Sequence, residues 1–167
     1  MRNIVLTGFM GTGKSSVGRL LAEKVGFDFV DTDAIISERH GPIPEIFSEL
    51  DEDAFRDMEH DVATELAQRV GLVIATGGRM LLDDRNAAAL DTTGTIFCLT
   101  ATVDELIGRL TVDGEHEKRP LLAGADPRQT IADLLAERSE GYGQFTQVDT
   151  TGRTIDQIAQ SIVEQLS

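Results

Sequence analysis

Residues 8–15 read GFMGTGKS and carry the strongest chemical pattern in the sequence. They follow the apolar run Ile4-Val5-Leu6 and precede an amphipathic stretch, which is the strand–loop–helix setting that the loop G-x-x-x-x-G-K-[ST] requires. Glycines let successive backbone N–H groups turn toward phosphate oxygens, and the dipole of the following helix attracts the same anion. The pattern predicts a binding site for a nucleoside triphosphate.

The side chains of this loop predict which atoms meet the nucleotide. Lys14 would supply positive charge to the β- and γ-phosphates, and the Ser15 hydroxyl would ligate Mg²⁺. We expect the nucleotide to be bound by Gly11, Thr12, Gly13, Lys14, Ser15 and Ser16. Switches, motors and small-molecule kinases all use such a loop, so it does not name a reaction by itself.

Two carboxylates follow the second apolar run, in the segment DTD at residues 31–33. If the strand continues through this segment, alternation places Asp31 and Asp33 on one side and Thr32 on the other. Asp31 would then support the metal ion, and Asp33 would face the hydroxyl of a phosphate acceptor. The alternative for Asp33 alone is a solvated cap of a helix that begins near Ala34.

The elements that must position these residues are predicted from hydrophobic periodicity. Strand-like runs occupy residues 4–6, 27–30, 72–75 and 95–99. Helical spacing occupies residues 14–25, 44–47, 53–69, 83–90, 103–110, 127–137 and 155–166. This alternation predicts an α/β fold with a mostly parallel sheet and helices on both faces, in a single domain over residues 1–167. Ligands of such sheets bind at the carboxyl ends of the strands.

One helix and one strand end contain residues of further interest. The helix at 53–69 is expected to bury the stripe Ala54, Met58, Val62 and Leu66. Arg56 then lies on the opposite face, where a solvated arginine is the simplest interpretation. After the third strand, Gly77 and Gly78 indicate a close approach of the backbone to a ligand or another segment, and the charged Arg79 follows them.

Composition narrows the class of partner. The chain has 29 acidic and 15 basic residues, a formal net charge of −14, which disfavours nonspecific binding to nucleic acids or anionic membranes. No apolar run is long enough for a membrane helix, and the N-terminus enters a strand pattern too early for a signal peptide. The single cysteine, Cys98, is expected to be a buried strand residue, which fits a reducing cytoplasm.

Taken in order, the motifs resemble those of the shikimate kinases, P-loop kinases of small molecules, from about residue 3 to residue 160. The segments that carry the resemblance are GFMGTGKSSVGRLLA, DTD, PEIFSELDEDAFRDMEHDV, ATGG and KRPLLAG. The resemblance implies a three-layer fold with a mainly parallel five-stranded sheet, an acceptor-binding helical segment at about residues 33–62 and a mobile lid at about 111–126. It implies transfer of the ATP γ-phosphoryl group to the 3-hydroxyl of shikimate in aromatic amino-acid biosynthesis, with Mg²⁺.

On the acceptor side, the resemblance assigns roles to individual residues. Asp33 would orient or deprotonate the attacking hydroxyl. Arg56, oriented by Glu59, and Arg138 would hold the carboxylate of shikimate, a group that the planar guanidinium recognises with two parallel hydrogen bonds. The paired glycines Gly77 and Gly78 would let the backbone approach the ring.

On the nucleotide side, Arg109 and Arg153 would flank the adenine. Arg119 stands beside Pro120 in residues 111–126, which lack periodicity. It would reach the transferring phosphate as the lid closes and excludes water, so the expected catalytic groups are Lys14, Asp33 and Arg119.

The sequence departs from the family at two places in the expected acceptor pocket. Arg79 stands where the family usually has a third glycine, and the segment RSEGYGQ after Arg138 keeps Tyr142 but lacks the usual proline. Arg79 either points out of the pocket, adds an anion contact or changes the acceptor. The alternatives are therefore a sister kinase of another hydroxy acid or polyol, such as gluconate, and a non-catalytic nucleotide-binding module. We expect a cytoplasmic monomer whose partners are ATP and a small carboxylate.

Overall fold

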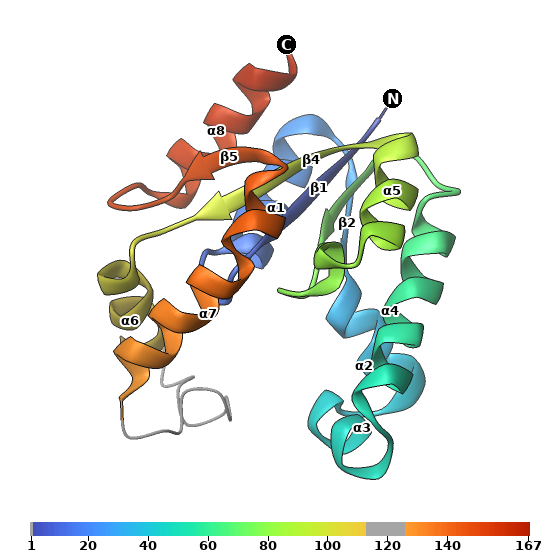
Figure 1. The fold of residues 1–167 in the computed structure, drawn as a ribbon. Helices are drawn as coiled ribbons and strands as arrows, with labels where there is room; N and C mark the ends of the chain where they lie inside the picture. The colour runs from blue at the N-terminus through green and yellow to red at the C-terminus, as the bar shows by residue number, and fades with distance from the viewer. Residues whose placement is uncertain (1, 113–125) are drawn as a thin grey trace.

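The computed structural model describes residues 2–112 and 126–167 as strands and helices in alternation (Figure 1). The strands are β1 (Asn3–Gly8), β2 (Asp28–Asp31), β3 (Leu72–Ala75), β4 (Gly94–Thr100) and β5 (Thr146–Asp149). The helices before β3 are α1 (Lys14–Val25), α2 (Thr32–His40), α3 (Ile43–Glu49) and α4 (Glu52–Leu66). Those after it are the short 3₁₀ turn η1 (Met80–Leu82), α5 (Asp84–Thr93), α6 (Val103–Val112), α7 (Pro127–Gly143) and α8 (Ile155–Leu166).

The strands of the described residues form one parallel sheet in the order β2-β3-β1-β4-β5. Every residue of the central strand β1 is buried, because helices cover both faces of the sheet. Alternate side chains along β1 enter opposite cores: Val5 packs toward α4 and α5, and Leu6 packs toward α1 and α8. The predicted α/β architecture with a five-stranded parallel sheet is confirmed.

The layers of Figure 1 leave the carboxyl ends of β1, β2 and β3 at one edge of the sheet. The helices α2, α3 and α4 extend beyond that edge, and α6 and α7 pack against each other on the other side of the phosphate loop. The segment expected to bind the acceptor, residues 33–62, corresponds to α2, α3 and most of α4. Most of the expected lid, together with Arg119, lies outside the described residues.

Two elements differ from the sequence-based expectation. Helix α2 begins at Thr32, so Asp31 ends the strand and Asp33 lies in the first helical turn. The expected strand continuation through DTD is wrong, because the Asp31 carboxylate caps the helix by accepting the backbone N–H groups of Asp33 and Ala34. Strand β5 was not among the predicted runs, because only Val148 of its four residues is buried.

The buried stripe of α4 is also rotated from the predicted one. Its buried residues are Phe55, Glu59, Val62, Ala63 and Leu66, whereas Ala54 and Met58 are only partly buried. The rotation moves Arg56 from the expected solvated face to a half-buried position. A glutamate at the centre of an apolar stripe is the feature that hydrophobic periodicity could not interpret.

Cys98 is a buried residue of β4, as predicted. Within the described ranges, no helix combines the length and the apolar character that crossing a bilayer would need.

Candidate active site

The phosphate loop joins β1 to α1 with two glycines in the left-handed region, Gly11 at φ 82° and Gly13 at φ 91°. Gly13 is the N-cap of α1 and has no side chain to accept the first N–H groups of the helix, so these groups are left for an anion. The buried Thr12 hydroxyl donates to the carbonyl of Phe9 at 2.7 Å, which fixes the curve of the loop. The loop therefore has the shape and the donors of a phosphate site.

Lys14 curls back over this loop. Its ammonium group donates to the carbonyls of Gly8 at 2.6 Å and Phe9 at 3.1 Å. These contacts hold the positive charge at the carboxyl end of β1, beside the open N-terminus of α1, where a phosphate would meet both.

Ser15 and Asp31 meet at the edge of the same loop. The Ser15 hydroxyl donates to one carboxylate oxygen of Asp31 at 2.9 Å, while the other oxygen caps α2. This arrangement presents a hydroxyl and a carboxylate, the hard oxygen ligands that Mg²⁺ prefers. The cap of α2 thus also orients one of the two expected metal ligands.

The phosphate loop opens into a cavity of about 560 Å³ at the carboxyl ends of β1, β2 and β3. Many of the residues predicted to bind nucleotide, metal or acceptor line it: Gly11, Gly13, Lys14, Ser15, Ser16, Asp31, Asp33, Arg56, Glu59, Gly77, Gly78 and Arg138. Its apolar wall was not predicted and includes Ile43, Phe47 and Phe55 from α3 and α4. The cavity combines a polar floor with an apolar side, which suits a small ring that bears polar groups.

Gly77 stands where three segments approach each other. A Cβ atom at this position would lie 2.8 Å from an Asp33 carboxylate oxygen and 3.3 Å from a Glu59 oxygen, and the Gly77 N–H donates to the Thr32 hydroxyl at 3.1 Å. Neither Gly77 nor Gly78 has a positive φ. Close approach, rather than an unusual backbone conformation, therefore explains the glycine at position 77.

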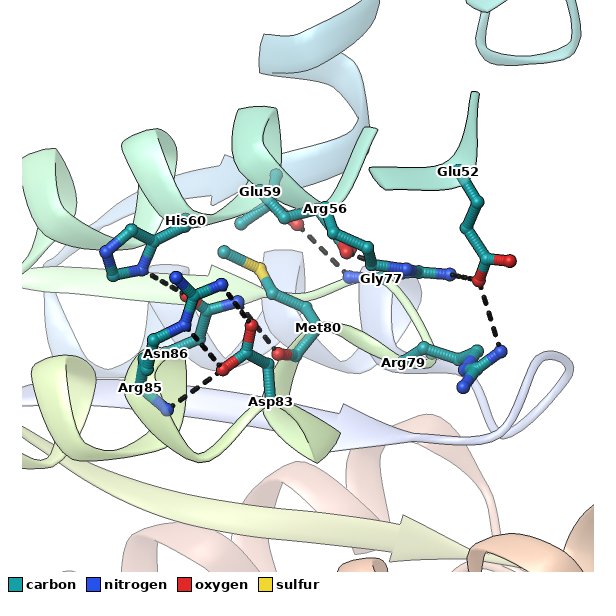
Figure 2. A network of polar contacts seen from close by, with 12 residues as sticks. Glu52, Arg56, Glu59, His60, Gly77, Arg79, Met80, Asp83, Arg85 and Asn86 are labelled. Carbon is teal, nitrogen blue, oxygen red and sulfur yellow. Dashed lines mark hydrogen bonds and ion pairs between the residues drawn. The ribbon is translucent and has the colours of Figure 1, made fainter. Parts of the chain in front are cut away.

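Arg56 is held by carboxylates on both sides, as Figure 2 shows. One guanidinium nitrogen pairs with Glu59, which is 1 % exposed, and the other pairs with the exposed Glu52 at 3.2 Å. The pKa of Glu59 is raised from its ordinary 4.5 to about 7. Burial is the largest cause, the charge and hydrogen bond of Arg56 oppose it, and the nearby Asp33 adds to it. The pair fixes the guanidinium at the cavity wall.

Arg138 reaches the cavity from α7 and is 8 % exposed. Its guanidinium lies 5.4 Å from the centre of the Phe9 ring and is 3.5 Å from the Tyr142 hydroxyl, which itself donates to the carbonyl of Gly78 at 2.6 Å. In residues 2–112 and 126–167, no carboxylate forms an ion pair with Arg138. A buried guanidinium in this state favours an anionic ligand.

Arg79 turns toward α4 rather than away from the site. Its side chain is 47 % exposed, lines the cavity and pairs with Glu52 at 3.3 Å (Figure 2). Arg79 is therefore exposed to solvent and also pairs with a carboxylate of this chain beside the cavity, and the alternatives of a further anion contact and of a changed acceptor stay open. Tyr142 and Glu52, which hold the glycine loop and the arginines in place, were not among the predicted site residues, although Tyr142 stood out beside Arg138 in the sequence.

The arginines expected beside the adenine make contacts of a different kind. Arg109 donates to the carbonyl of Gly11 at 3.1 Å and to the carbonyl of Thr150 at 2.9 Å, so it ties the phosphate loop to the turn after β5. Arg153 donates to the carbonyls of Asp149 and Gln157 at the start of α8. Neither side chain lines the described part of the cavity, nor does Thr12. Arg119 lies outside the described residues.

The chain resembles known proteins over nearly its whole length. It is 43 % identical to a shikimate kinase of Thermodesulfovibrio yellowstonii over 99 % of this chain and 95 % of the relative. It is 40 % identical to a shikimate kinase of Geobacter metallireducens over 99 % and 92 %, respectively. A solved shikimate kinase from Acinetobacter baumannii, in complex with shikimate, superposes with a TM-score of 0.90 at 36 % identity, covering 99 % of this chain and 93 % of that one.

A parallel sheet in this order, with a phosphate loop after its central strand and a cavity at the strand ends, defines a P-loop kinase of small molecules. The family model described as Shikimate kinase matches residues 10–167. The chain therefore belongs to the shikimate kinase family and is an ATP-dependent kinase that phosphorylates shikimate.

Proposed function

We propose that this chain transfers the γ-phosphoryl group of ATP to the 3-hydroxyl of shikimate with the residues that line the cavity. The observation that carries the assignment is Arg138, a buried guanidinium that faces the cavity and has no carboxylate partner among the described residues. A small acid would supply the missing anion. Arg56, on the α4 side of the same cavity, would share that carboxylate.

The donor side is assigned to the phosphate loop. Backbone N–H groups of Gly11, Thr12 and Gly13 and the start of α1 would surround the phosphates, with Ser16 in the first turn. Lys14 would exchange its carbonyl contacts for the β- and γ-phosphates. Mg²⁺ would be held by Ser15 and Asp31, whose oxygens lie 2.9 Å apart, and when bound it would neutralise charge on the phosphates.

The acceptor side is assigned to the other half of the cavity. With the carboxylate on Arg56 and Arg138, the ring would lie against Gly77 and Gly78, and Glu59 would keep Arg56 in place through its buried ion pair. Asp33, next to Gly77, would then receive the hydroxyl that attacks the phosphorus.

The reaction asks for little covalent chemistry from the protein. The acceptor oxygen forms a bond to the γ-phosphorus, the bond from that phosphorus to the β–γ bridging oxygen breaks, and the hydroxyl proton leaves toward Asp33. We assign to Asp33 the orientation of this hydroxyl and the acceptance of its proton. The resemblance further assigns Arg119 to the transferring phosphate and Arg109 and Arg153 to the adenine, and these roles remain proposals.

The arrangement of the cavity also supports action by a single chain. All the assigned groups within the described residues come from one polypeptide, so we propose a monomer. We place it in the cytoplasm, where ATP is available and where the single buried Cys98 stays reduced.

A coupled assay of ADP release with ATP and shikimate tests this function, with gluconate and AMP as competing acceptors. We expect turnover of shikimate with a KM in the micromolar to millimolar range and no comparable turnover of the other two. Phosphorus NMR of the product should show the ester at the 3-hydroxyl. Preferential turnover of gluconate or AMP would contradict the assignment, and ATP binding without turnover would indicate a non-catalytic module.

A further inference from the structure

Glu52, at the first position of α4, stands between two arginines of the cavity wall. The same carboxylate oxygen accepts from Arg56 at 3.2 Å and from Arg79 at 3.3 Å, as the dashed lines in Figure 2 show. Arg56 belongs to α4 itself, whereas Arg79 follows the glycine pair after β3. Glu52 therefore links the acceptor-binding helix to the glycine loop.

The two carboxylates on Arg56 are not equivalent. Glu59 is 1 % exposed and is fixed in the core stripe of α4. The Glu52 side chain is 55 % exposed, so it can move at little cost. One guanidinium nitrogen of Arg56 pairs with Glu52 and the other with Glu59. A substrate carboxylate that binds the first of these nitrogens must displace Glu52, and it leaves Glu59 in place.

We propose that Arg79 is a positioning residue for acceptor binding, because it retains Glu52 when the acceptor's carboxylate takes over Arg56. This inference rests on the proposed function, in which Arg56 binds that carboxylate. With Arg79 present, the displaced Glu52 leaves Arg56 and keeps a cationic partner. Without it, Glu52 pairs with Arg56 alone and competes with the substrate.

The position of Arg79 suits this role. Its backbone, at φ −106° and ψ −4°, is unstrained for a side chain, and its guanidinium lines the same cavity as Arg56 and Arg138. Burial raises the pKa of Glu59 and of Tyr142, and the charge of Arg79 opposes both shifts, which places Arg79 near the partners of both carboxylate-binding arginines. Arg79 thus sets how readily Arg56 is released to a ligand.

A set of three variants tests the inference by steady-state kinetics. Arg79→Gln should raise the KM for shikimate two- to fivefold, the range that a half-exposed ion pair is worth, with kcat and the KM for ATP unchanged. Glu52→Gln should leave that KM at or below the wild-type value. The double variant should return it to the Glu52→Gln value, because the competing carboxylate is gone.

Controls separate this role from others. Arg85→Gln removes an exposed ion pair with Asp83 in the same segment, outside the cavity, and should change none of the constants. An acceptor analogue with the carboxylate reduced to an alcohol should bind the wild type and Arg79→Gln equally. A defect in Arg79→Gln that persists in the double variant would mean that Arg79 touches the substrate directly, and an unchanged KM in Arg79→Gln would also overturn the proposal.

Failure of the proposed function is distinguishable from failure of this inference. Wild-type turnover of shikimate tests the former. Calorimetric titration of shikimate into the wild type and the three variants, without ATP, measures the affinity for the acceptor. It therefore tests whether the substrate carboxylate replaces Glu52 on Arg56, even where turnover is lost. The same order of affinities is expected there, with Arg79→Gln weakest, and equal affinities would contradict the exchange.

Discussion

Asp33 shows how a single side chain depends on its neighbours. Its carboxylate lies so close to the Gly77 backbone that a Cβ atom there would be 2.8 Å from it, and it raises the pKa of Glu59. The Asp33 carboxylate therefore lies beside Glu59 at the cavity. This setting keeps the carboxylate near the point where the acceptor hydroxyl is proposed to lie.

Replacement of Asp33 with asparagine tests its role at the residue scale. Asp33→Asn keeps the shape but removes the charge and the proton acceptor, so we expect kcat to fall by about 10²-fold or more. The KM for ATP and the melting temperature should stay close to the wild-type values. A wild-type kcat in this variant would show that the hydroxyl needs neither orientation nor a base at this position.

Glu59 makes the stability of the ligand-free protein depend on pH. Its pKa is about 7 in the folded chain and 4.5 ordinarily, so between these values the folded state binds more protons than the unfolded state. The free energy of unfolding should therefore fall as the pH rises from 4.5 to 7 and level off above 7. From pH 5 to pH 8 the loss due to Glu59 is up to about 2.5 kcal/mol.

Urea unfolding of the wild type and Glu59→Gln at pH 5 and pH 8 measures this contribution. The wild type should lose more stability over this interval than the variant, because glutamine does not ionise. Equal pH dependence in the two proteins would show that Glu59 keeps an ordinary pKa, held charged by Arg56.

The burial of Arg138 is expected to destabilise the ligand-free protein and to favour binding of the acceptor. Its burial without a carboxylate partner among the described residues costs solvation, which the Phe9 ring and the Tyr142 hydroxyl offset in part. Arg138→Met should leave the melting temperature of the ligand-free protein unchanged or higher. It should raise the KM for shikimate about 10- to 100-fold, the worth of a charged hydrogen bond of about 1.5–3 kcal/mol. A lower melting temperature with an unchanged KM would indicate a purely structural arginine.

At the scale of elements, the site depends on how α2, α4 and α7 are fastened to the loop after β3. Thr32 of α2 accepts the N–H of Gly77, and Tyr142 of α7 donates to the carbonyl of Gly78. From α4, His60 donates to the buried Asn86, whose side chain donates to the carbonyl of Met80 at 3.0 Å (Figure 2). Three helices therefore hold one short segment, which fixes the positions of the proposed acceptor-binding residues relative to one another.

The two glycines of this segment offer a matched pair of substitutions. Gly77→Ala would push its methyl group against Asp33, whereas a Cβ at Gly78 would meet Arg138 at 3.6 Å, an ordinary contact. We expect Gly77→Ala to lower kcat at least tenfold by displacing the carboxylate. Gly78→Ala should keep the wild-type melting temperature and most of its kcat, and its effect should fall on the KM for shikimate, because the ring is proposed to lie against Gly78. Similar kcat values in the two alanine variants would contradict the role of close approach at Gly77.

Secondary structure was predictable where the hydrophobic pattern is regular. The bounds predicted for α1, α8 and β3 agree with the structure, since these elements bury a clear stripe or run. Periodicity does not predict helix α2, which enters only as the alternative of a helix beginning near Ala34; it begins at Thr32 because Asp31, the last residue of the strand, is its cap. Residues such as Glu52 and Tyr142 act through contacts between segments far apart in the chain, which a local pattern does not contain.

At the scale of the whole molecule, the acidic chain places three of its twelve arginines at one cavity, where an anion is needed. The net charge is −14, yet Arg56, Arg79 and Arg138 line one cavity together with Lys14. The phosphate loop and the spacing of its lysine and serine were predictable because backbone chemistry dictates them. The position of Arg79 against Glu52 was not predictable from the sequence, because it depends on how the segment after β3 packs on α4.

The central claim is that a small acid lies between α4 and α7 with its hydroxyl at Asp33. A crystal structure of this chain with shikimate and ADP tests it most directly. We expect the carboxylate within hydrogen-bond distance of Arg56 and Arg138, the ring against Gly77 and Gly78, and the 3-hydroxyl within hydrogen-bond distance of Asp33. A carboxylate bound elsewhere, or a 3-hydroxyl turned away from Asp33, would contradict the account.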